Sequence, residues 1–203
     1  MRVLIPGIDG YIGWSLALNQ LSKGNQVCGF DNFSRRKNVE EMDSHSGIPI
    51  ISMNERIIRL TKDYGEKFRC GEGDLLDAGF TDTISKDFQP DVVVHLAEQP
   101  SAPYSMIDQK HNVYTQQNNV IGNLNLLHTI QRHSPNAHLI KLGTMGEYGY
   151  DPGLEIPEGF YEIEFRGKKA KVPYPRLAGS WYHWTKVHDS NNIMFACKLW
   201  GLK

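Results

Sequence analysis

Cysteine is scarce in this chain. Cys28, Cys70 and Cys197 are the only three in 203 residues, and they lie far apart with no C-x-x-C pair. An odd number of widely spaced cysteines argues against a disulfide scaffold and against a structural zinc site, so we expect no metal. Cys28 falls in a strand-like segment, where we expect it to be a small core residue.

Long apolar runs and an excess of charge are also absent. No segment approaches the roughly 20 apolar residues that span a bilayer, and 22 basic residues face 23 acidic ones, which gives a formal net charge of −1. We therefore expect neither nucleic acid nor a membrane as the main partner. Because the first strand-like segment begins at residue 2, we expect no signal peptide and a cytoplasmic protein. A plastid import sequence that has been removed stays an open alternative.

Strand-like and helix-like segments alternate along the chain. Short apolar runs with turn signals predict strands at 3–6, 26–31, 68–70, 91–96 and 137–142. Helical spacing predicts helices at 11–23, 54–64, 80–88, 113–133 and 179–200. This alternation predicts an α/β fold with a doubly wound parallel sheet, buried on both faces.

Two long segments interrupt this pattern and are expected to be binding loops or lids. Residues 32–67 link the second and third strands and have a loop-like middle at 43–49, while residues 151–178 contain a hairpin-like piece at 160–172. The chain ends on its last helix with no sixth strand. We therefore interpret residues 1–203 as one nucleotide-binding domain, the N-terminal portion of a longer enzyme that lacks most of its substrate domain.

A glycine turn follows the first strand and opens the first helix. Gly7, Gly10 and Gly13 have the spacing G-x-x-G-x-x-G, which allows a tight turn, close approach of a diphosphate and packing of helix against strand. The helix N-terminus adds free N–H groups and partial positive charge. The turn predicts a dinucleotide site with contacts at Gly7, Asp9, Gly10, Tyr11, Ile12 and Gly13. This spacing resembles the extended branch of the short-chain dehydrogenase/reductase superfamily.

An acidic residue lies at the end of the second strand. Asp31 can accept hydrogen bonds from ribose hydroxyls and repel a 2′-phosphate, which favours NAD over NADP. Arg35 and Arg36 favour the opposite choice, because arginine accommodates a 2′-phosphate. Asp74 is expected to accept a hydrogen bond from the adenine amino group. The other predicted cofactor contacts are Asn32, Leu75, Leu96, Ala97 and Asn119.

The last helix contains a Tyr-x-x-x-Lys motif. Tyr182 and Lys186 are one turn apart and face the same way. We expect the ammonium group and the nicotinamide ring to lower the pKa of the phenol, so that it exchanges a proton with a substrate hydroxyl. Thr144, after the fifth strand, is placed to hydrogen-bond the same oxygen. Asn119 is disfavoured in a helix without a role, so we expect a structural or relay function.

Longer strings resemble the UDP-sulfoquinovose synthase family. They are residues 95–108, 113–122, 141–149 and 182–192, and the resemblance spans essentially the whole chain. It implies an extended dehydrogenase fold with tightly held NAD, which converts UDP-glucose and sulfite to UDP-sulfoquinovose. Where the family usually has arginine this chain has Pro100, which puts the predicted sulfite site in question.

The resemblance also implies roles for individual residues. Tyr182 would deprotonate the 4-hydroxyl of glucose, Lys186 would lower its pKa, and Thr144 would hold the sugar oxygen. Glu147 and His183 would handle protons at C5 and C6, although His183 could equally be a packing residue. The predicted substrate contacts are Gln99, Ser101, Tyr104, Ser105, Thr144, Met145, Gly146, Glu147 and His183.

Three alternatives follow from the same residues. A 4-epimerase or a 4,6-dehydratase shares the Thr144, Tyr182 and Lys186 set, although the acid pair typical of dehydratases is replaced here by Met145 and Gly146. A non-catalytic NAD-binding or dimerisation module fits the short chain. A homodimer formed through the helices at 113–133 and 179–200 is expected in the enzymatic readings.

Overall fold

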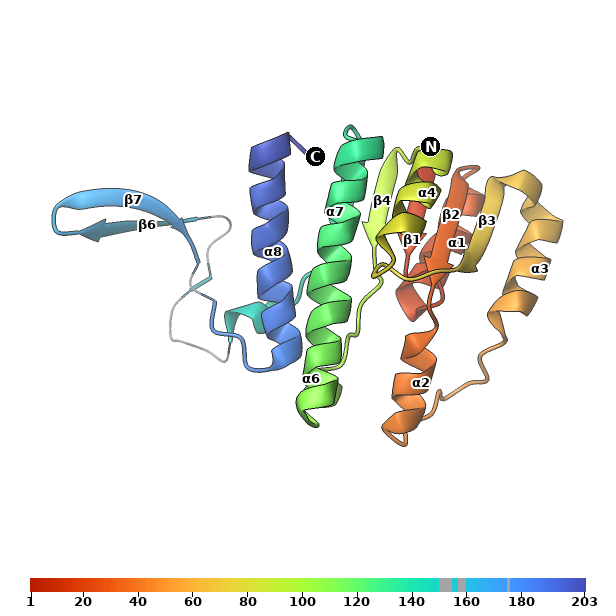
Figure 1. Cartoon of the computed structure of the whole chain (residues 1–203), viewed down its shortest axis with the longest axis horizontal. Coiled ribbons are helices and arrows are strands. Elements are labelled where there is room, and N and C mark those ends of the chain that lie inside the picture. The colour runs from red at the N-terminus through yellow and green to blue at the C-terminus, as the bar shows by residue number, and fades with distance from the viewer. Residues whose placement is uncertain (150–154, 157–159, 175) are drawn as a thin grey trace.

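Five parallel strands form the central sheet. The computed structural model describes residues 1–149, 155–156, 160–174 and 176–203. The strands are β1 (Arg2–Pro6), β2 (Gln26–Asp31), β3 (Phe68–Glu72), β4 (Val92–His95) and β5 (His138–Lys141). Their order is β3-β2-β1-β4-β5, and every pair is parallel (Figure 1). The predicted doubly wound sheet is confirmed.

Helices cover both faces of this sheet. The long ones are α1 (Tyr11–Ser22), α3 (Met53–Tyr64), α4 (Ala78–Phe88), α7 (Gly122–His133) and α8 (Trp181–Trp200). Successive side chains of a pleated strand point to opposite faces of the sheet. Leu4, Cys28 and Val93 therefore pack in one core cluster, with α4, α7 and α8. Val3 and Val27 pack in the other, with α1 and α3. Cys28 is therefore a core residue as predicted, and burial raises the pKa of its thiol to about 11.

The predicted helix at 113–133 is one part of a longer helical run. It begins with α6 (Gln109–Gln116), passes through a π-helical turn, η2 (Gln117–Ile121), and continues as α7. The earlier start has a local cause, because the Asp108 carboxylate accepts a hydrogen bond from His111 N at 2.9 Å and caps the helix. π turns insert one extra residue and often mark functional sites.

Shorter elements fill the links. Helix α2 (Ser34–Glu41) lies inside the predicted insertion 32–67 and was not expected, whereas the helix expected at 54–64 is α3. The others are α5 (Ala102–Ser105) and the 3₁₀ turns η1 (Gly65–Lys67) and η3 (Met145–Tyr148). The expected loop at 43–49 has no helix or strand.

The predicted hairpin is confirmed as β6 (Phe160–Phe165) and β7 (Lys168–Pro173), which pair antiparallel and project away from the central sheet (Figure 1). Its two charged cross-strand pairs, Glu162 with Lys171 and Glu164 with Lys169, lie on one face. Other parts of the predicted insertion 151–178 lie outside the described residues.

The carboxyl edge of the sheet is where a site is expected. The strand order reverses at β1: β2 and β3 are added on one side of it, and β4 and β5 on the other. Ligands of open α/β sheets bind at such a switch point. The described helices include none that is long and apolar enough to cross a membrane. The described part of the chain also holds no metal-binding group of three or more His, Cys, Asp or Glu side chains.

Candidate active site

The glycine turn after β1 has the close approaches that its spacing predicts. Gly7 has φ of 86°, and a side-chain carbon added there would lie 2.5 Å from the backbone N of Ala97. At Gly13 the added carbon would lie 2.3 Å from the Gly7 carbonyl oxygen. No side chain in the described residues caps α1 at Gly10, so N–H groups of its first turn stay available to a ligand. The turn therefore fits a diphosphate.

Asp9 connects this turn to two arginines. Its carboxylate is held by Arg36 at 2.6 and 2.8 Å and by Arg56 at 3.1 Å. Arg36, which we expected to contact a phosphate, is thus paired with a carboxylate. Arg56 also lies 4.6 Å from the Trp14 ring centroid and was missed by the sequence analysis. Because Arg56 comes from α3, far along the chain, no local pattern could have indicated it.

The predicted ribose and adenine residues lie together at the ends of β2 and β3. The Asp31 carboxylate accepts hydrogen bonds from Asp9 N at 3.0 Å and Phe33 N at 2.8 Å. Burial raises the pKa of Asp31, and these two backbone donors oppose the rise. Asn32 Nδ2 donates to Asp74 Oδ2 at 2.9 Å, which joins the two loops.

The other predicted cofactor residues differ in how far their side chains are buried. Leu75 is buried in the core, while Leu96 and Ala97 offer backbone beside Gly7. Tyr11 and Ile12 are exposed at the start of α1. For Arg35 the structure gives only a position, on α2 beside Arg36.

Asn119 lies inside the π turn and is fully buried. Its Oδ1 accepts from Gln99 N at 2.9 Å, and its Nδ2 donates to Gln99 O at 3.1 Å and to Thr185 Oγ1 at 2.9 Å. The side chain therefore joins three elements: the loop after β4, the π turn and α8. This supports the structural role expected for it, and a direct cofactor contact remains a prediction.

Tyr182 and Lys186 lie one turn apart on α8, as predicted. Ser180 caps this helix, because its hydroxyl accepts from His183 N at 3.2 Å. Lys186 Nζ lies 5.8 Å from the centroid of the Tyr182 ring and donates to Leu142 O at 2.8 Å. The same ammonium also contacts the Glu98 carboxylate.

The expected fall in the pKa of Tyr182 is not found. Burial raises the pKa of this phenol, and the negative charges of Glu147 and Asp189 raise it further. The ammonium of Lys186 is already held by Glu98 and a carbonyl, and burial lowers its own pKa to about 8. The described residues alone therefore favour the protonated form of this phenol.

The loop after β5 brings Thr144, Glu147 and His183 together. Thr144 Oγ1 accepts from Gly146 N at 3.2 Å, which leaves its O–H free to donate. The His183 ring packs on Gly146, where an added side-chain carbon would lie 2.4 Å from the ring. The ring Nδ1 lies 2.9 Å from Ser180 Oγ, and burial lowers the pKa of His183. Met145 is exposed at the loop surface.

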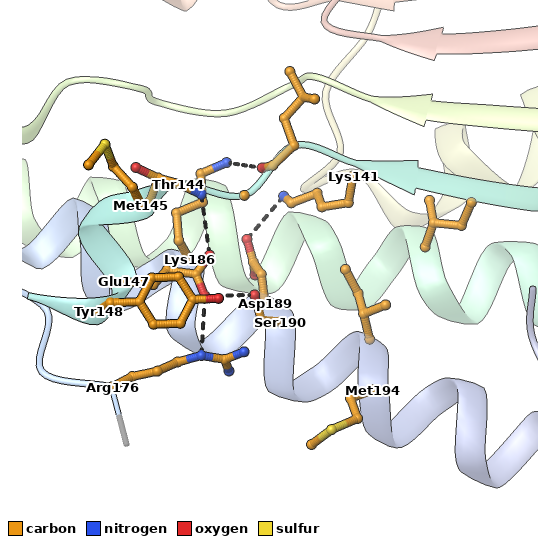
Figure 2. A pocket seen from close by; sticks show the side chains of 14 residues that line it. Lys141, Thr144, Met145, Glu147, Tyr148, Arg176, Lys186, Asp189, Ser190 and Met194 are labelled. Atoms are coloured by element: carbon orange, nitrogen blue, oxygen red, sulfur yellow. Dashed lines mark hydrogen bonds and ion pairs between the residues drawn. The ribbon is translucent and has the colours of Figure 1, made fainter. Parts of the chain in front are cut away.

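Glu147 is buried beneath this loop. Its Oε1 accepts from Thr144 N at 3.4 Å, and its Oε2 accepts from Ser190 Oγ at 2.9 Å and lies 3.4 Å from Arg176 Nε. Figure 2 shows Arg176 and Ser190 on either side of this carboxylate. With these partners Glu147 stabilises the loop; its predicted role in proton transfer stays a prediction.

Three predicted substrate contacts lie beneath the surface, and their contact with substrate stays a prediction. Gln99, Tyr104 and Ser105 are buried, and their polar groups already have partners. Gln99 bonds Ser101 and Thr115, the Tyr104 hydroxyl donates to Glu41, and the Ser105 hydroxyl accepts from Tyr182 N at 3.1 Å. In the chain alone these polar groups are engaged in internal hydrogen bonds. Ser101 is half-buried and caps α5.

A cavity of about 560 Å³ lies between the end of β5 and α8 (Figure 2). Thr144, Met145, Glu147 and Lys186 are the predicted site residues that line it, while Tyr182 does not. The lining residues that sequence analysis did not assign a role include Lys141, Arg176, Asp189 and Ser190. Asp189 follows Lys186 by three residues on the same helix, a spacing that could have indicated it.

The sequence matches a known protein family over most of its length. Residues 3–195 match the NAD dependent epimerase/dehydratase family. The chain is 48% identical over its whole length to the chloroplastic UDP-sulfoquinovose synthase of Spinacia oleracea, of which it covers 42%. It is 45% identical, again over its whole length, to the UDP-sulfoquinovose synthase of Sulfolobus acidocaldarius, of which it covers 51%.

A solved structure shares the fold. The UDP-glucose 4-epimerase of Thermotoga maritima, determined with UDP-glucose, aligns with the whole chain at a TM-score of 0.68 and 20% identity, and 53% of that protein is covered. The chain thus spans about half the length of the relatives that it matches. The fold, the glycine turn and the match over residues 3–195 agree, and the chain belongs to the NAD dependent epimerase/dehydratase family.

Proposed function

We propose that the protein converts UDP-glucose and sulfite to UDP-sulfoquinovose and water, with NAD as a recycled cofactor. The observation that carries the proposal is the 45–48% identity to two UDP-sulfoquinovose synthases over the whole chain. The chain itself holds the set Thr144, Tyr182 and Lys186. The relatives are longer than this chain, so the proposal concerns the whole protein.

The residues at the carboxyl edge support binding of NAD. The glycine turn would hold the diphosphate, and Asp31 would accept hydrogen bonds from the adenosine ribose. When bound there, NAD would supply reversible hydride transfer at C4 of the glucose. Its positive nicotinamide ring is the charge that Tyr182 lacks in the chain alone.

The chain's own residues would then move protons. Tyr182 takes the proton of the 4-hydroxyl while the C4 hydride leaves, with Thr144 donating a hydrogen bond to the same oxygen. The 4-ketone acidifies the C5 proton; its removal and loss of the C6 hydroxyl as water leave an unsaturated ketone. Sulfite adds to C6, a proton returns to C5, and Tyr182 protonates the C4 oxygen as the hydride returns.

His183 is the better candidate for proton transfer at C5 and C6. Its ring lies on Gly146, beside Thr144, and burial lowers its pKa, so it stays neutral and can accept a proton. Glu147 is held by Thr144 N, Ser190 and Arg176, which favours a structural role.

Product analysis tests this function. NAD-loaded protein is incubated with UDP-glucose, with and without sulfite, and the products are separated by mass. We expect a sulfonated nucleotide sugar only when sulfite is present. A 4-keto-6-deoxy sugar or UDP-galactose as the sole product would contradict the proposal and favour a dehydratase or an epimerase.

The preference for NAD is a separate prediction. Asp31→Asn removes a negative charge beside the expected position of the ribose, so NAD should bind about tenfold more weakly and the discrimination against NADP should narrow. Calorimetry with both cofactors gives the ratio of the dissociation constants for NADP and NAD. Asp91→Asn, an exposed carboxylate paired with Arg2 at the other end of β4, is the matched control and should leave the ratio unchanged. A ratio unaltered by Asp31→Asn would contradict the assignment.

We further propose a homodimer. Helices α6 to α8, with η2, carry the exposed large apolar side chains Val113, Ile121, Met194, Phe195 and Leu199. Exposed apolar surface on neighbouring helices is typical of a protein interface. A monomer that persists at all concentrations in gel filtration would contradict the dimer.

A further inference from the structure

Four charged side chains form a buried cluster between the sheet and α8. They are Glu98, Lys141, Lys186 and Asp189, with exposed side-chain fractions of 5%, 9%, 7% and 1%. Two lysines and two carboxylates make the cluster formally neutral. Charges are rarely buried unless they are paired, because each loses its hydration.

The Glu98 carboxylate lies at the centre of this cluster. One oxygen contacts Lys141 Nζ and the other contacts Lys186 Nζ. Lys141 Nζ also lies 3.0 Å from Asp189 Oδ2. Figure 2 marks this ion pair with a dashed line. Three elements supply these groups: Glu98 follows β4, Lys141 ends β5, and the other two lie on α8. Glu98 is therefore shared between the lysine of the Tyr-x-x-x-Lys motif and a second lysine that competes for it.

The other titratable groups around Lys186 are few. Tyr182 is on the same helix, and the negative charges of Asp189 and, from η3, Glu147 raise the pKa of Lys186. His95, on β4, is buried, and burial with the charges of Lys141 and Lys186 holds its pKa well below the usual range. His95 is therefore neutral, which leaves Lys141 as the cation that competes with Lys186.

The balance of charges decides whether Lys186 stays protonated. Burial lowers the pKa of Lys186 to about 8, and that of Lys141 to about 7. An adjacent carboxylate favours the ammonium form, and an adjacent ammonium disfavours it. Because only a protonated lysine can stabilise the Tyr182 phenolate, the carboxylate that keeps it charged affects the chemistry without touching substrate.

We propose that Glu98 is a positioning residue, which holds Lys186 protonated beside Tyr182, and that Lys141 limits this hold by sharing the same carboxylate. The proposal rests on the proposed function only for its effect on catalysis. Its effect on the protonation of Lys186 is a property of the folded chain and can be measured without substrate.

Two variants should change the pKa of Lys186 in opposite directions. Glu98→Gln removes the carboxylate and leaves the Lys141 charge, so the pKa of Lys186 should fall by about 1 to 3 pH units. Lys141→Met removes the competing positive charge, so the pKa of Lys186 should rise. Because Lys141→Met leaves Asp189 without its partner, Lys141→Gln is the second variant: it removes the same charge, and its amide can still donate to Asp189 Oδ2. It keeps the Asp189 charge, which itself raises the pKa of Lys186. It should therefore also raise this pKa, and it keeps the test available if Lys141→Met does not fold.

The first measurement is a pH titration by NMR of ¹³C-labelled lysine in the NAD-loaded protein. Lys186→Arg assigns the signal, and Glu164→Gln on the exposed hairpin is the matched control for loss of a carboxylate that contacts a lysine. A lower titration midpoint of Lys186 in Glu98→Gln and a higher midpoint in the Lys141 variants support the proposal. An unchanged midpoint in Glu98→Gln, or a lower midpoint in Lys141→Gln, overturns it.

The second measurement separates this proposal from the proposed function. At high pH the rate of NADH formation with UDP-glucose should fall as Lys186 loses its proton. This fall, the basic limb of the pH profile, should move to lower pH in Glu98→Gln and to higher pH in Lys141→Gln. A merely structural role would lower the rate at every pH and leave the limb in place, which would overturn the positioning role. If no variant forms NADH and neither does the native protein, the proposed function fails while the NMR midpoints still decide the position of the Lys186 proton.

Discussion

Replacing Tyr182 with phenylalanine should lower the rate of NADH formation from UDP-glucose by about a thousandfold, since positioned acid–base groups contribute roughly 10² to 10⁴. The change removes one oxygen and leaves the ring, which is half-buried on α8. Backbone N–H of residue 182 would still donate to Ser105 Oγ, so the helix should keep its place. The measurement is a single-turnover trace of NADH fluorescence in NAD-loaded protein.

The physical reason is the environment of the phenol. Burial and the charges of Glu147 and Asp189 raise the pKa of Tyr182, so the hydroxyl stays protonated in the chain alone. Only a site completed by the nicotinamide charge would make it a base at neutral pH. Tyr161→Phe, on the hairpin, is the matched control and should leave the rate unchanged. A Tyr182→Phe protein that forms NADH at the native rate would exclude this residue as the base.

The second large effect is expected at the glycine turn. Gly7→Ala should destabilise the protein by about 2 to 5 kcal/mol, the sum of left-handed strain and overpacking. The added carbon would lie 2.5 Å from backbone atoms of residues 96 and 97, which cannot move without shifting β4. The free energy of unfolding, from denaturant titration, gives this cost, and NAD binding should be lost.

Gly24 provides a matched control for this substitution. Its φ of 79° is close to the 86° of Gly7, but an added carbon would meet nothing within 4 Å. Gly24→Ala should therefore cost only the left-handed strain, about 1 to 2 kcal/mol, and keep NAD affinity. Equal costs for the two variants would show that close approach to β4 is not what requires glycine at position 7.

The fold could be predicted because local signals agreed with one another. Apolar runs, the turn at Gly7 and the helical spacing each indicated the same parallel sheet, and the structure confirms it. The π turn at 117–121 and helix α2 were missed. Asn119 in the π turn donates a long-range hydrogen bond to Thr185, a contact that a local pattern does not reveal. Helix α2 is rich in charge and has little apolar periodicity.

Only those residues of the site that belong to a recognisable motif could be predicted from the sequence. The Tyr-x-x-x-Lys spacing correctly placed two side chains one turn apart. It could not indicate that Glu98 and Lys141, from two other elements, would meet Lys186 beneath the surface. Nor could residue type show that Tyr104 and Ser105 would be buried with their hydroxyls already bonded. Such pairings depend on tertiary packing, which a single sequence does not display.

The most direct test of the account follows one hydrogen atom. UDP-glucose carrying deuterium at C4 is converted with sulfite in ordinary water, and the product is analysed by mass spectrometry and NMR. If the hydride leaves C4 for bound NAD and returns within the same turnover, the deuterium should remain at C4 of UDP-sulfoquinovose while hydrogen from water enters at C5. Loss of the label from C4, or a sulfonated product formed by protein stripped of NAD, would contradict the account.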